Sequence, residues 1–547
     1  MNEGISNRDP ILSIRDLTVT VEATDIQVVR SNSFDIRAGE TVCVVGESGS
    51  GKSVTSLSVM GLLPKGALRP AGRVLLDGED ILTASPARLR ALRATRMAMV
   101  FQEPMTALNP VERVGAQIAE VLRVHGIRSP RARRARVVEM MEAVHLPDPE
   151  RLYDAYPHQL SGGQRQRIVI CMALILRPKL LIADEPTTAL DVTTQAQILT
   201  LIRELQEKFG TAVLFITHDF GVVAEIADRI VVMNQGRVVE TGSRDQILAR
   251  PVEPYTRMLV SSVPSLVPRP ARGQDGEPCL EVSALDKTYR EGGLFGGGRT
   301  VQAVRDAHLE LHRGEVVGLV GESGSGKSTL ARCIVRLVDP TAGSVSLGGT
   351  EIATLPRRRL RPIRKRIQIV FQDPYRSLNA RLKVGEAIIE GLLNYGTPRA
   401  KAEARAREMI QLVGLEPDAL SRYPHQFSGG QRQRICIARA LTMEPEVLVA
   451  DEAVSALDVS VQKQVLDLLE EIRVRTGVAI LFITHDLRVA AQICDRILVM
   501  KTGEVVESGP AADVLTRPTH PYTRQLLAAA PGRGWDFANF RPLAEAG

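Results

Sequence analysis

The eight residues Gly46-Glu47-Ser48-Gly49-Ser50-Gly51-Lys52-Ser53 directly follow the short apolar run Thr41–Val45. They fit the phosphate-binding loop pattern, in which glycines let successive backbone N–H groups face a phosphate at the start of a helix. The pattern predicts that Lys52 reaches the β- and γ-phosphates of a nucleotide. It also predicts that the hydroxyl of Ser53 binds Mg²⁺.

The chain repeats this loop and several other elements. The second loop comprises Gly321, Glu322, Ser323, Gly324, Ser325, Gly326, Lys327 and Ser328, followed by Thr329. The string SGGQRQRI stands at Ser161–Ile168 and Ser428–Ile435, and LFITHD stands at Leu214–Asp219 and Leu481–Asp486. Two copies of one domain in tandem account for this repetition.

We expect the first domain at residues 11–262, a linker at 263–278, the second domain at 279–530 and a C-terminal tail at 531–547. The linker is rich in proline and glycine, which is typical of a connecting segment. The run Gly292–Gly298 predicts a flexible hairpin loop. In each copy, short apolar runs alternate with helical stretches, which predicts an α/β fold whose mainly parallel sheet is covered on both faces.

Composition limits the class of protein. Apolar residues make up 44% of the chain and charged residues 24%, which suits globular domains. The chain has six cysteines, and none of them form a C-x-x-C pair. This spacing argues against a zinc ribbon and against a disulfide framework. A reducing cytosol is therefore the expected compartment. The chain shows no signal peptide and no apolar run of the ~18 residues that a membrane helix needs. A membrane path would therefore come from other chains.

The formal charge of +6 comes in part from arginine clusters at residues 131–134 and 357–359. They fit either a solvated helix face or contact with anionic lipid headgroups or RNA.

Paired acids end two of the apolar runs. Asp184 and Glu185 follow Leu180–Ala183, and Asp451 and Glu452 follow Val447–Ala450. Behind a phosphate loop, the first acid of each pair suits indirect Mg²⁺ binding and the second suits a general base for the attacking water. His218 and His485 occupy the same place in the repeated LFITHD string, which favours a role at the γ-phosphate.

Further motifs resemble those of the ABC ATPases. Leu160 and Phe427 precede a signature made of Ser161, Gly162, Gly163 and Gln164 in one copy and Ser428, Gly429, Gly430 and Gln431 in the other. Gln102 and Gln372 resemble the Q-loop glutamine, Ala189–Asp191 and Ala456–Asp458 resemble the D-loop, and the two histidines match the H-switch. The resemblance covers residues 12 to about 530.

The resemblance implies two P-loop NTPase domains, each with a mainly parallel core sheet, an antiparallel β subdomain and an α-helical signature subdomain. It implies hydrolysis of ATP to ADP and phosphate, with Gln102 and Gln372 joining the serines and aspartates at Mg²⁺. The domains would pair head to tail within the chain, so that each phosphate loop, with its Glu and His, meets the signature of the other copy.

Tail elements resemble those of the dipeptide, oligopeptide and nickel importer ATPases. They are Pro254-Tyr255-Thr256 and His520-Pro521-Tyr522-Thr523, and the strings at 184–191 (DEPTTALD) and 451–458 (DEAVSALD) match one partner each. Fused forms include the glutathione-import type, which the second half resembles most. This implies two integral membrane permease subunits, contacted near the Q-loops, a solute-binding protein and no nucleic acid. The place would be the cytoplasmic face of the bacterial inner membrane.

Several alternatives stay open at this point. Peptides, glutathione among them, lead as solutes, but nickel and opine-like or sugar-like solutes fit as well. The rival class is a soluble twin-ABC ATPase that acts on the ribosome or on nucleic acid. The ribosome-bound group typically has a long charged linker, and the DNA-repair group needs zinc-binding cysteine pairs, neither of which the sequence contains.

Two departures concern cofactors and nucleotide. Tyr289 stands where an aromatic residue of the family stacks on adenine, whereas the first copy has Val21 there. No cysteine follows Tyr522, and only Cys279 lies between Tyr255 and the second domain, so no iron–sulfur cluster is expected. The cofactors implied are ATP and Mg²⁺.

Overall fold

The computed structural model describes residues 9–102, 107–187, 190–270, 272, 277–290, 300–455 and 457–543. The chain divides into two compact units, one formed by Met1–Val263 together with Phe537–Gly547 and the other by Pro264–Asp536. The hairpin predicted at Gly292–Gly298 lies outside the described residues. Among the described helices, none combines the length and the apolar character that crossing a bilayer requires.

The first unit contains two sheets. The six-stranded sheet has the order β10-β9-β3-β8-β7-β6, with all neighbours parallel except β9 and β10. The four-stranded sheet, β2-β1-β4-β5, is antiparallel. The strands are β1 (Leu12–Val21), β2 (Ile26–Ile36), β3 (Thr41–Val45), β4 (Leu68–Leu76), β5 (Glu79–Asp80), β6 (Met97–Val100), β7 (Leu180–Asp184), β8 (Ala212–Ile216), β9 (Arg229–Asn234), β10 (Arg237–Ser243) and, in the tail, β22 (Arg541–Pro542).

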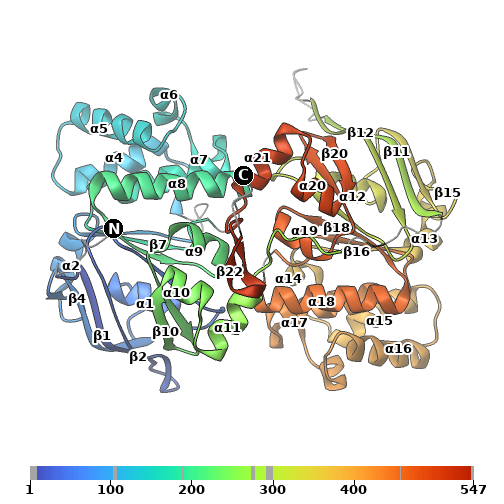
Figure 1. Cartoon of the computed structure of the whole chain (residues 1–547), viewed down its shortest axis with the longest axis horizontal. Coiled ribbons are helices and arrows are strands. Elements are labelled where there is room, and N and C mark those ends of the chain that lie inside the picture. The colour runs from blue at the N-terminus through green and yellow to red at the C-terminus, as the bar shows by residue number, and fades with distance from the viewer. Residues whose placement is uncertain are drawn as a thin grey trace. The chain divides into compact units, whose positions relative to one another are not determined.

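The helices of the first unit cover the core sheet and build a separate helical cluster. In Figure 1, α4, α5 and α6 gather at the end of the unit away from β1, β2 and β4. The helices are α1 (Lys52–Val59), α2 (Pro86–Leu92), α4 (Val114–Val124), α5 (Pro130–Ala143), α6 (Pro149–Tyr153), η1 (Pro157–Gln159), α7 (Gly162–Leu174), α8 (Val192–Phe209), α9 (Phe220–Ile226), α10 (Arg244–Ala249), α11 (Pro254–Ser261) and η4 (Phe537–Asn539).

The second unit repeats the plan. Its core sheet has the order β16-β17-β18-β13-β19-β20, and its antiparallel sheet the order β12-β11-β14-β15. The strands are β11 (Pro278–Arg290), β12 (Thr300–His312), β13 (Val316–Val320), β14 (Ala342–Leu347), β15 (Thr350–Glu351), β16 (Ile367–Val370), β17 (Val447–Asp451), β18 (Ala479–Thr484), β19 (Arg496–Lys501), β20 (Glu504–Pro510) and β21 (Trp535–Asp536). The expected α/β class and its parallel and antiparallel sheets are confirmed.

The helices of the second unit follow the same order as those of the first. They are α12 (Lys327–Ile334), α13 (Arg357–Arg366), α14 (Pro374–Ser377), α15 (Val384–Asn394), α16 (Arg399–Leu412), η2 (Pro417–Ser421), η3 (Pro424–Gln426), α17 (Gly429–Leu441), α18 (Val459–Thr476), α19 (Leu487–Ile493), α20 (Ala511–Thr516) and α21 (Pro521–Ala529).

The central strands explain why the core sheets form. Every residue of β3 and of β13 is buried, and both strands are rich in valine. In the second unit, Val317 and Leu319 pack with Leu280 of the antiparallel sheet, whereas Val316 and Val320 pack with the helical residues. A parallel strand that is covered on both faces needs such a continuous apolar run.

The linker and the tail are both built into folded units. Arg269 of the predicted linker forms ion pairs with Glu470 (3.4 Å) and Asp495 (3.6 Å), and its amide donates to the carbonyl of Ala491. In the predicted tail, Phe537 is fully buried and η4 contacts α11 of the first unit. We propose the boundaries 11–262 and 279–530 for the two repeated domains, with a tail that completes the first unit.

Candidate active sites

The first phosphate loop joins β3 to α1 and encloses the Lys52 side chain. A Cβ atom on Gly46, where φ is 150°, would lie 2.2 Å from the carbonyl oxygen of Met233, so the close approach of β9 requires glycine there. Lys52 Nζ donates to the carbonyl oxygens of Gly46 (2.7 Å) and Glu47 (2.9 Å). The ammonium group is thus fixed inside the loop, beside the backbone N–H groups that open α1.

The second loop has the same geometry. Lys327 Nζ donates to the carbonyl oxygens of Gly321 (2.8 Å) and Glu322 (2.7 Å). A Cβ atom on Gly321 would lie 2.2 Å from the carbonyl oxygen of Met500. Both lysines are buried, so each loop holds a positive charge that an anionic phosphate can neutralise.

Each loop serine contacts the acid that ends the neighbouring strand. Ser53 Oγ donates to Asp184 Oδ1 (3.3 Å), and Ser328 Oγ donates to Asp451 Oδ1 (3.0 Å). Burial raises the pKa of both aspartates, although the serine hydrogen bonds oppose this shift. A cation would restore the charged form of each carboxylate.

These oxygens fit Mg²⁺, which binds hard oxygen ligands and keeps several of its waters. In the second unit a cavity of about 400 Å³ is lined by Ser328, Gln372 and Asp451 together. The room beside the hydroxyl and carboxylate oxygens is therefore sufficient for a hydrated ion and a phosphate group.

The expected general bases lie at the centre of a hydrogen-bonded group. Glu185 follows β7 with φ 48°, in the left-handed region that is costly for a residue with a side chain. Gln102 Nε2 donates to Glu185 Oε2 (2.7 Å), and His218 Nδ1 lies 3.1 Å from Glu185 Oε1. The structure thus gathers residues from three strand ends around one carboxylate.

The second unit repeats this group. Glu452 has φ 49°, accepts from Gln372 Nε2 at 2.8 Å and lies 3.5 Å from His485 Nδ1. Burial alone would raise the pKa of Glu452, but the contact with His485 outweighs it and the pKa falls. Burial alone would lower the pKa of His485, but Glu452 outweighs it and the pKa rises. Each partner favours the charged form of the other.

The signature residues lie at the N-termini of α7 and α17. Ser161 Oγ accepts from the amide of Gln164 (3.3 Å), and Gln164 Oε1 accepts from the amide of Ser161 (2.9 Å). Ser428 and Gln431 form the same capping box. The helix N-terminus presents free N–H groups and a positive dipole end, which suits an anion.

One signature glycine in each copy also has a packing role that the sequence did not reveal. A Cβ atom on Gly163 would lie 2.5 Å from Thr194 of α8, and one on Gly430 would lie 2.2 Å from Val461 of α18. The D-loop residues Ala189 and Ala456 lie outside the described residues.

Strand register places Val21 and Tyr289 at the same position of the two antiparallel sheets. In the first unit, Leu12 of β1 pairs with Leu76, and in the second, Leu280 of β11 pairs with Leu347. Val21 lies nine residues after Leu12 and pairs with Ile26. Tyr289 lies nine residues after Leu280 and pairs with Val301. Tyr289 is 39% exposed, and the ammonium of Lys287 lies 5.0 Å from the centroid of its ring. The ring is therefore accessible, and its stacking on adenine stays a prediction.

Two contacts of the phosphate loops escaped the sequence reasoning. The hydroxyls of Tyr255 and Tyr522 accept hydrogen bonds from the loop amides of Glu47 (3.3 Å) and Glu322 (3.2 Å). The available signal was the repetition of the Pro-Tyr-Thr element at the same distance from both signatures.

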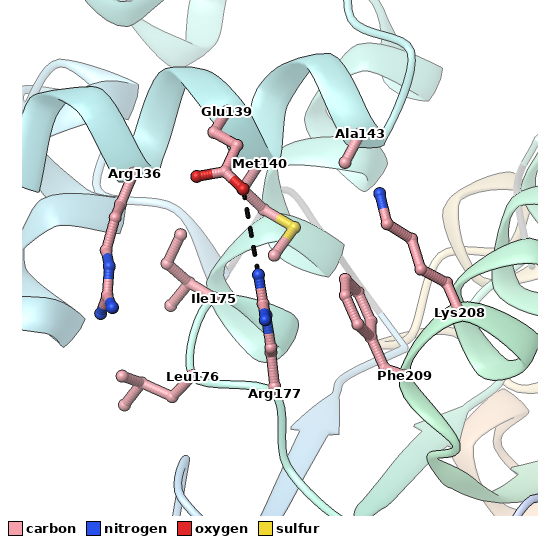
Figure 2. Close-up of a pocket in the computed structure, with 9 residues that line it drawn as sticks. All are labelled: Arg136, Glu139, Met140, Ala143, Ile175, Leu176, Arg177, Lys208 and Phe209. Carbon is pink, nitrogen blue, oxygen red and sulfur yellow. Dashed lines mark ion pairs between the residues drawn. The ribbon is translucent and has the colours of Figure 1, made fainter.

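A separate cavity of about 270 Å³ lies between α5, the end of α7 and the end of α8, and Figure 2 shows its lining. Arg177 pairs with Glu139 (3.9 Å) and covers the ring of Phe209 at 5.2 Å. The second copy has Glu444 in place of Arg177, and Glu444 pairs with Arg405 (3.1 Å). The positive charge of Arg177 is therefore not repeated in the second copy, and none of the residues that line this cavity belongs to the phosphate loop or to the group around Glu185.

Comparison with known proteins decides the family. A model of the family described as ABC transporter matches residues 29–188 and 304–455, more than half of the chain. The chain belongs to the ABC transporter family. It therefore has two ABC ATPase domains and is an ATP-binding, ATP-hydrolysing protein, as the sequence predicted. A second model, described as oligopeptide/dipeptide transporter, C-terminal region, matches residues 239–288 and 506–538, which include both Pro-Tyr-Thr elements.

Curated relatives of this ABC ATPase match over nearly its whole length. Proteins described as glutathione import ATP-binding protein GsiA, from Escherichia coli O6:H1 and from Pectobacterium atrosepticum, are each 47% identical to it over 95% of this chain and 89% of their own. The protein of the same description from Salmonella choleraesuis is 46% identical over 97% and 91%. The resemblance to the fused importer ATPases is confirmed, and the ribosome or nucleic-acid alternative finds no support.

Proposed function

We propose that this ABC ATPase powers the import of peptides, of the di- or oligopeptide or the glutathione class, through separate membrane subunits. The observation that carries the proposal is the match of residues 239–288 and 506–538, which include the last helices of the two ATPase domains, to the oligopeptide/dipeptide transporter C-terminal region. The printed names of the full-length relatives point to the glutathione class in particular. The partners are two integral permease subunits and a solute-binding protein.

Each ATP would be bound by the loop backbone and by Lys52 or Lys327, which compensates the charge of the β- and γ-phosphates. Ser53 with Asp184, and Ser328 with Asp451, would hold Mg²⁺, with Gln102 and Gln372 near it. The ion, when bound, neutralises charge that develops on the phosphate oxygens. Tyr289 would stack on one adenine.

Glu185 and Glu452 would accept a proton from the attacking water. The left-handed backbone directs each carboxylate, and His218 or His485 on one oxygen and Gln102 or Gln372 on the other fix its orientation. The same His can donate to the γ-phosphate. Because each unit holds a complete set, we propose two hydrolytic sites, each completed by the signature Ser161–Gln164 or Ser428–Gln431 of the other domain.

Fusion of the two domains raises the effective concentration of each for the other and guarantees unlike partners. ATP-driven closing and hydrolysis-driven opening would be transmitted to the permease subunits near Gln102 and Gln372. The proposed location is the cytoplasmic face of a bacterial inner membrane, where the chain would act as a peripheral subunit.

One arginine cluster is engaged within the protein. Arg134 pairs with Glu150 (2.9 Å) and covers the ring of Tyr153, and Arg133 donates to the carbonyls of Ile127 and Arg128. A structural role on a solvated helix face accounts for these two side chains. The cluster at Arg357–Arg359 is exposed.

Val21→Tyr is expected to tighten ATP binding at the Lys52 site about fivefold. Base–aromatic stacking contributes ~1–3 kcal/mol, and valine already supplies part of this, so we take about 1 kcal/mol. The measurement is ATP affinity in a Lys327→Ala chain with and without Val21→Tyr. The same change in a Lys52→Ala chain is the control and should have no effect. No response to the tyrosine in the Lys327→Ala chain would show that another group already covers that adenine.

Solute uptake tests the proposed function directly. A strain that lacks this chain is complemented with wild type or with the Glu185→Gln/Glu452→Gln double variant, and uptake of labelled glutathione, dipeptides and an oligopeptide is measured. We expect wild type, but not the variant, to restore uptake of one of these. If neither restores any peptide uptake while both are produced, or if ribosomes or DNA stimulate the purified ATPase, the importer proposal is wrong.

A further inference from the structure

The Pro-Tyr-Thr elements bring a tyrosine hydroxyl to each phosphate loop. Tyr255 lies on α11 and Tyr522 on α21, and each hydroxyl oxygen accepts from the amide of the second loop residue, Glu47 at 3.3 Å and Glu322 at 3.2 Å. Tyr255 also donates to the Glu47 carboxylate at 3.4 Å. The contact occurs in both copies, and it spans 208 residues in the first copy and 200 in the second.

The peptide that each tyrosine contacts is the one that also holds the loop lysine. The carbonyl of Gly46 and the amide of Glu47 belong to the same planar peptide group, so fixing one fixes the other. Lys52 Nζ donates to that carbonyl at 2.7 Å, and Tyr255 accepts from that amide. In the second copy, Lys327 and Tyr522 hold the peptide between Gly321 and Glu322 in the same way.

The helices that carry the two tyrosines are anchored to edge strands of the core sheets. Glu240 of β10 accepts from the amides of Val252 (2.8 Å) and Glu253 (3.1 Å), just before α11. Glu507 of β20 accepts from the amides of Thr519 (2.7 Å) and His520 (3.2 Å), just before α21. A carboxylate that accepts two backbone N–H bonds makes a strong, directional anchor. Each of the helices α11 and α21 is therefore fixed to the edge of its core sheet, with its tyrosine directed at the phosphate loop.

We propose that Tyr255 and Tyr522 are positioning residues for ATP binding: each orients the first peptide of its phosphate loop and thereby the ammonium of Lys52 or Lys327. The inference rests on the proposed assignment of both loops to ATP. It gives the transporter-type C-terminal region a role inside the nucleotide site, because α11 and α21 each supply one hydrogen bond that the loop does not form by itself.

The test removes only the hydroxyl. Tyr255→Phe in a Lys327→Ala chain, and Tyr522→Phe in a Lys52→Ala chain, are expected to weaken ATP binding about fivefold, the effect of one lost hydrogen bond. The melting temperature should stay unchanged, because phenylalanine keeps the packing of the ring. In the full chain, the double Tyr→Phe variant should raise KM for ATP about fivefold and change kcat by less than about twofold.

Tyr153→Phe is the matched control, since Tyr153 lies on α6 and stacks under Arg134; its ATP affinity should equal that of its parent. Parent-like ATP affinity in both Tyr→Phe chains would overturn the inference, and so would a loss of affinity that follows a fall in melting temperature. If the parent Lys327→Ala and Lys52→Ala chains themselves bind no ATP while the full chain does, the assignment of independent loop sites fails instead. The two failures are therefore distinguishable.

Discussion

Replacing both Glu185 and Glu452 with glutamine is expected to slow ATP hydrolysis by about 10²–10⁴-fold, the usual effect of removing a general base. Glutamine keeps the size of the side chain but cannot accept the proton of the attacking water. ATP binding should persist, because the loops, Lys52 and Lys327 are untouched. Phosphate release by the purified chain measures the rate, and retention of labelled ATP after gel filtration measures the trapped nucleotide.

Each single variant should also be slowed strongly, because both units carry the same group of Glu, His and Gln. Glu204→Gln is a suitable control, since Glu204 is an exposed residue of α8 that contacts His145. Wild-type turnover in Glu185→Gln or in Glu452→Gln would contradict the proposal of two working sites.

Phe537→Ala is expected to destabilise the first unit by about 3–5 kcal/mol, the usual cost of removing a fully buried phenylalanine ring. Phe537 is 0% exposed, although it lies ten residues from the end of the chain. Urea unfolding followed by circular dichroism measures the loss, and the transition of the first unit should move to lower urea. Phe540→Ala, in the same tail but only partly buried, should cost clearly less. Equal, small effects of both changes would contradict a role for the tail in that core.

Local patterns predicted the centre of each domain well. The apolar run Thr41–Val45 is a strand over its whole length, and its counterpart in the second copy is the strand Val316–Val320. The runs before Asp184 and Asp451 are strands that include the acid itself. These segments succeed because apolar, β-branched runs between a glycine-rich loop and a helix have few alternative structures. The loop motifs are equally local, since each is fixed by its own glycines and by the helix that follows it.

Contacts between distant segments were not predictable from the sequence. The sequence predicted a linker around Arg269. In the structure, Glu470 of α18 and Asp495, which precedes β19, form ion pairs with Arg269, and a backbone hydrogen bond to Ala491 holds the same residue. The hydrogen bonds of Tyr255 and Tyr522 join residues that lie 208 and 200 positions apart in the chain. The periodicity of the sequence does not predict that α11 and α21 lie beside the phosphate loops. Likewise, the sequence predicted only a ligand-binding role for Gly163. The close packing of α8 against this position also requires glycine.

The return of Phe537 to the first unit has a consequence for the synthesis of the chain. The first unit consists of Met1–Val263 and Phe537–Gly547, so its core is encoded in two pieces separated by the whole second unit. Bacterial and eukaryotic translation at ~5–20 residues per second would delay the second piece by roughly 15–60 s after the first. Until then, the surface that Phe537 covers stays exposed on the nascent chain. The amino-terminal unit, although made first, is therefore the last to be completed.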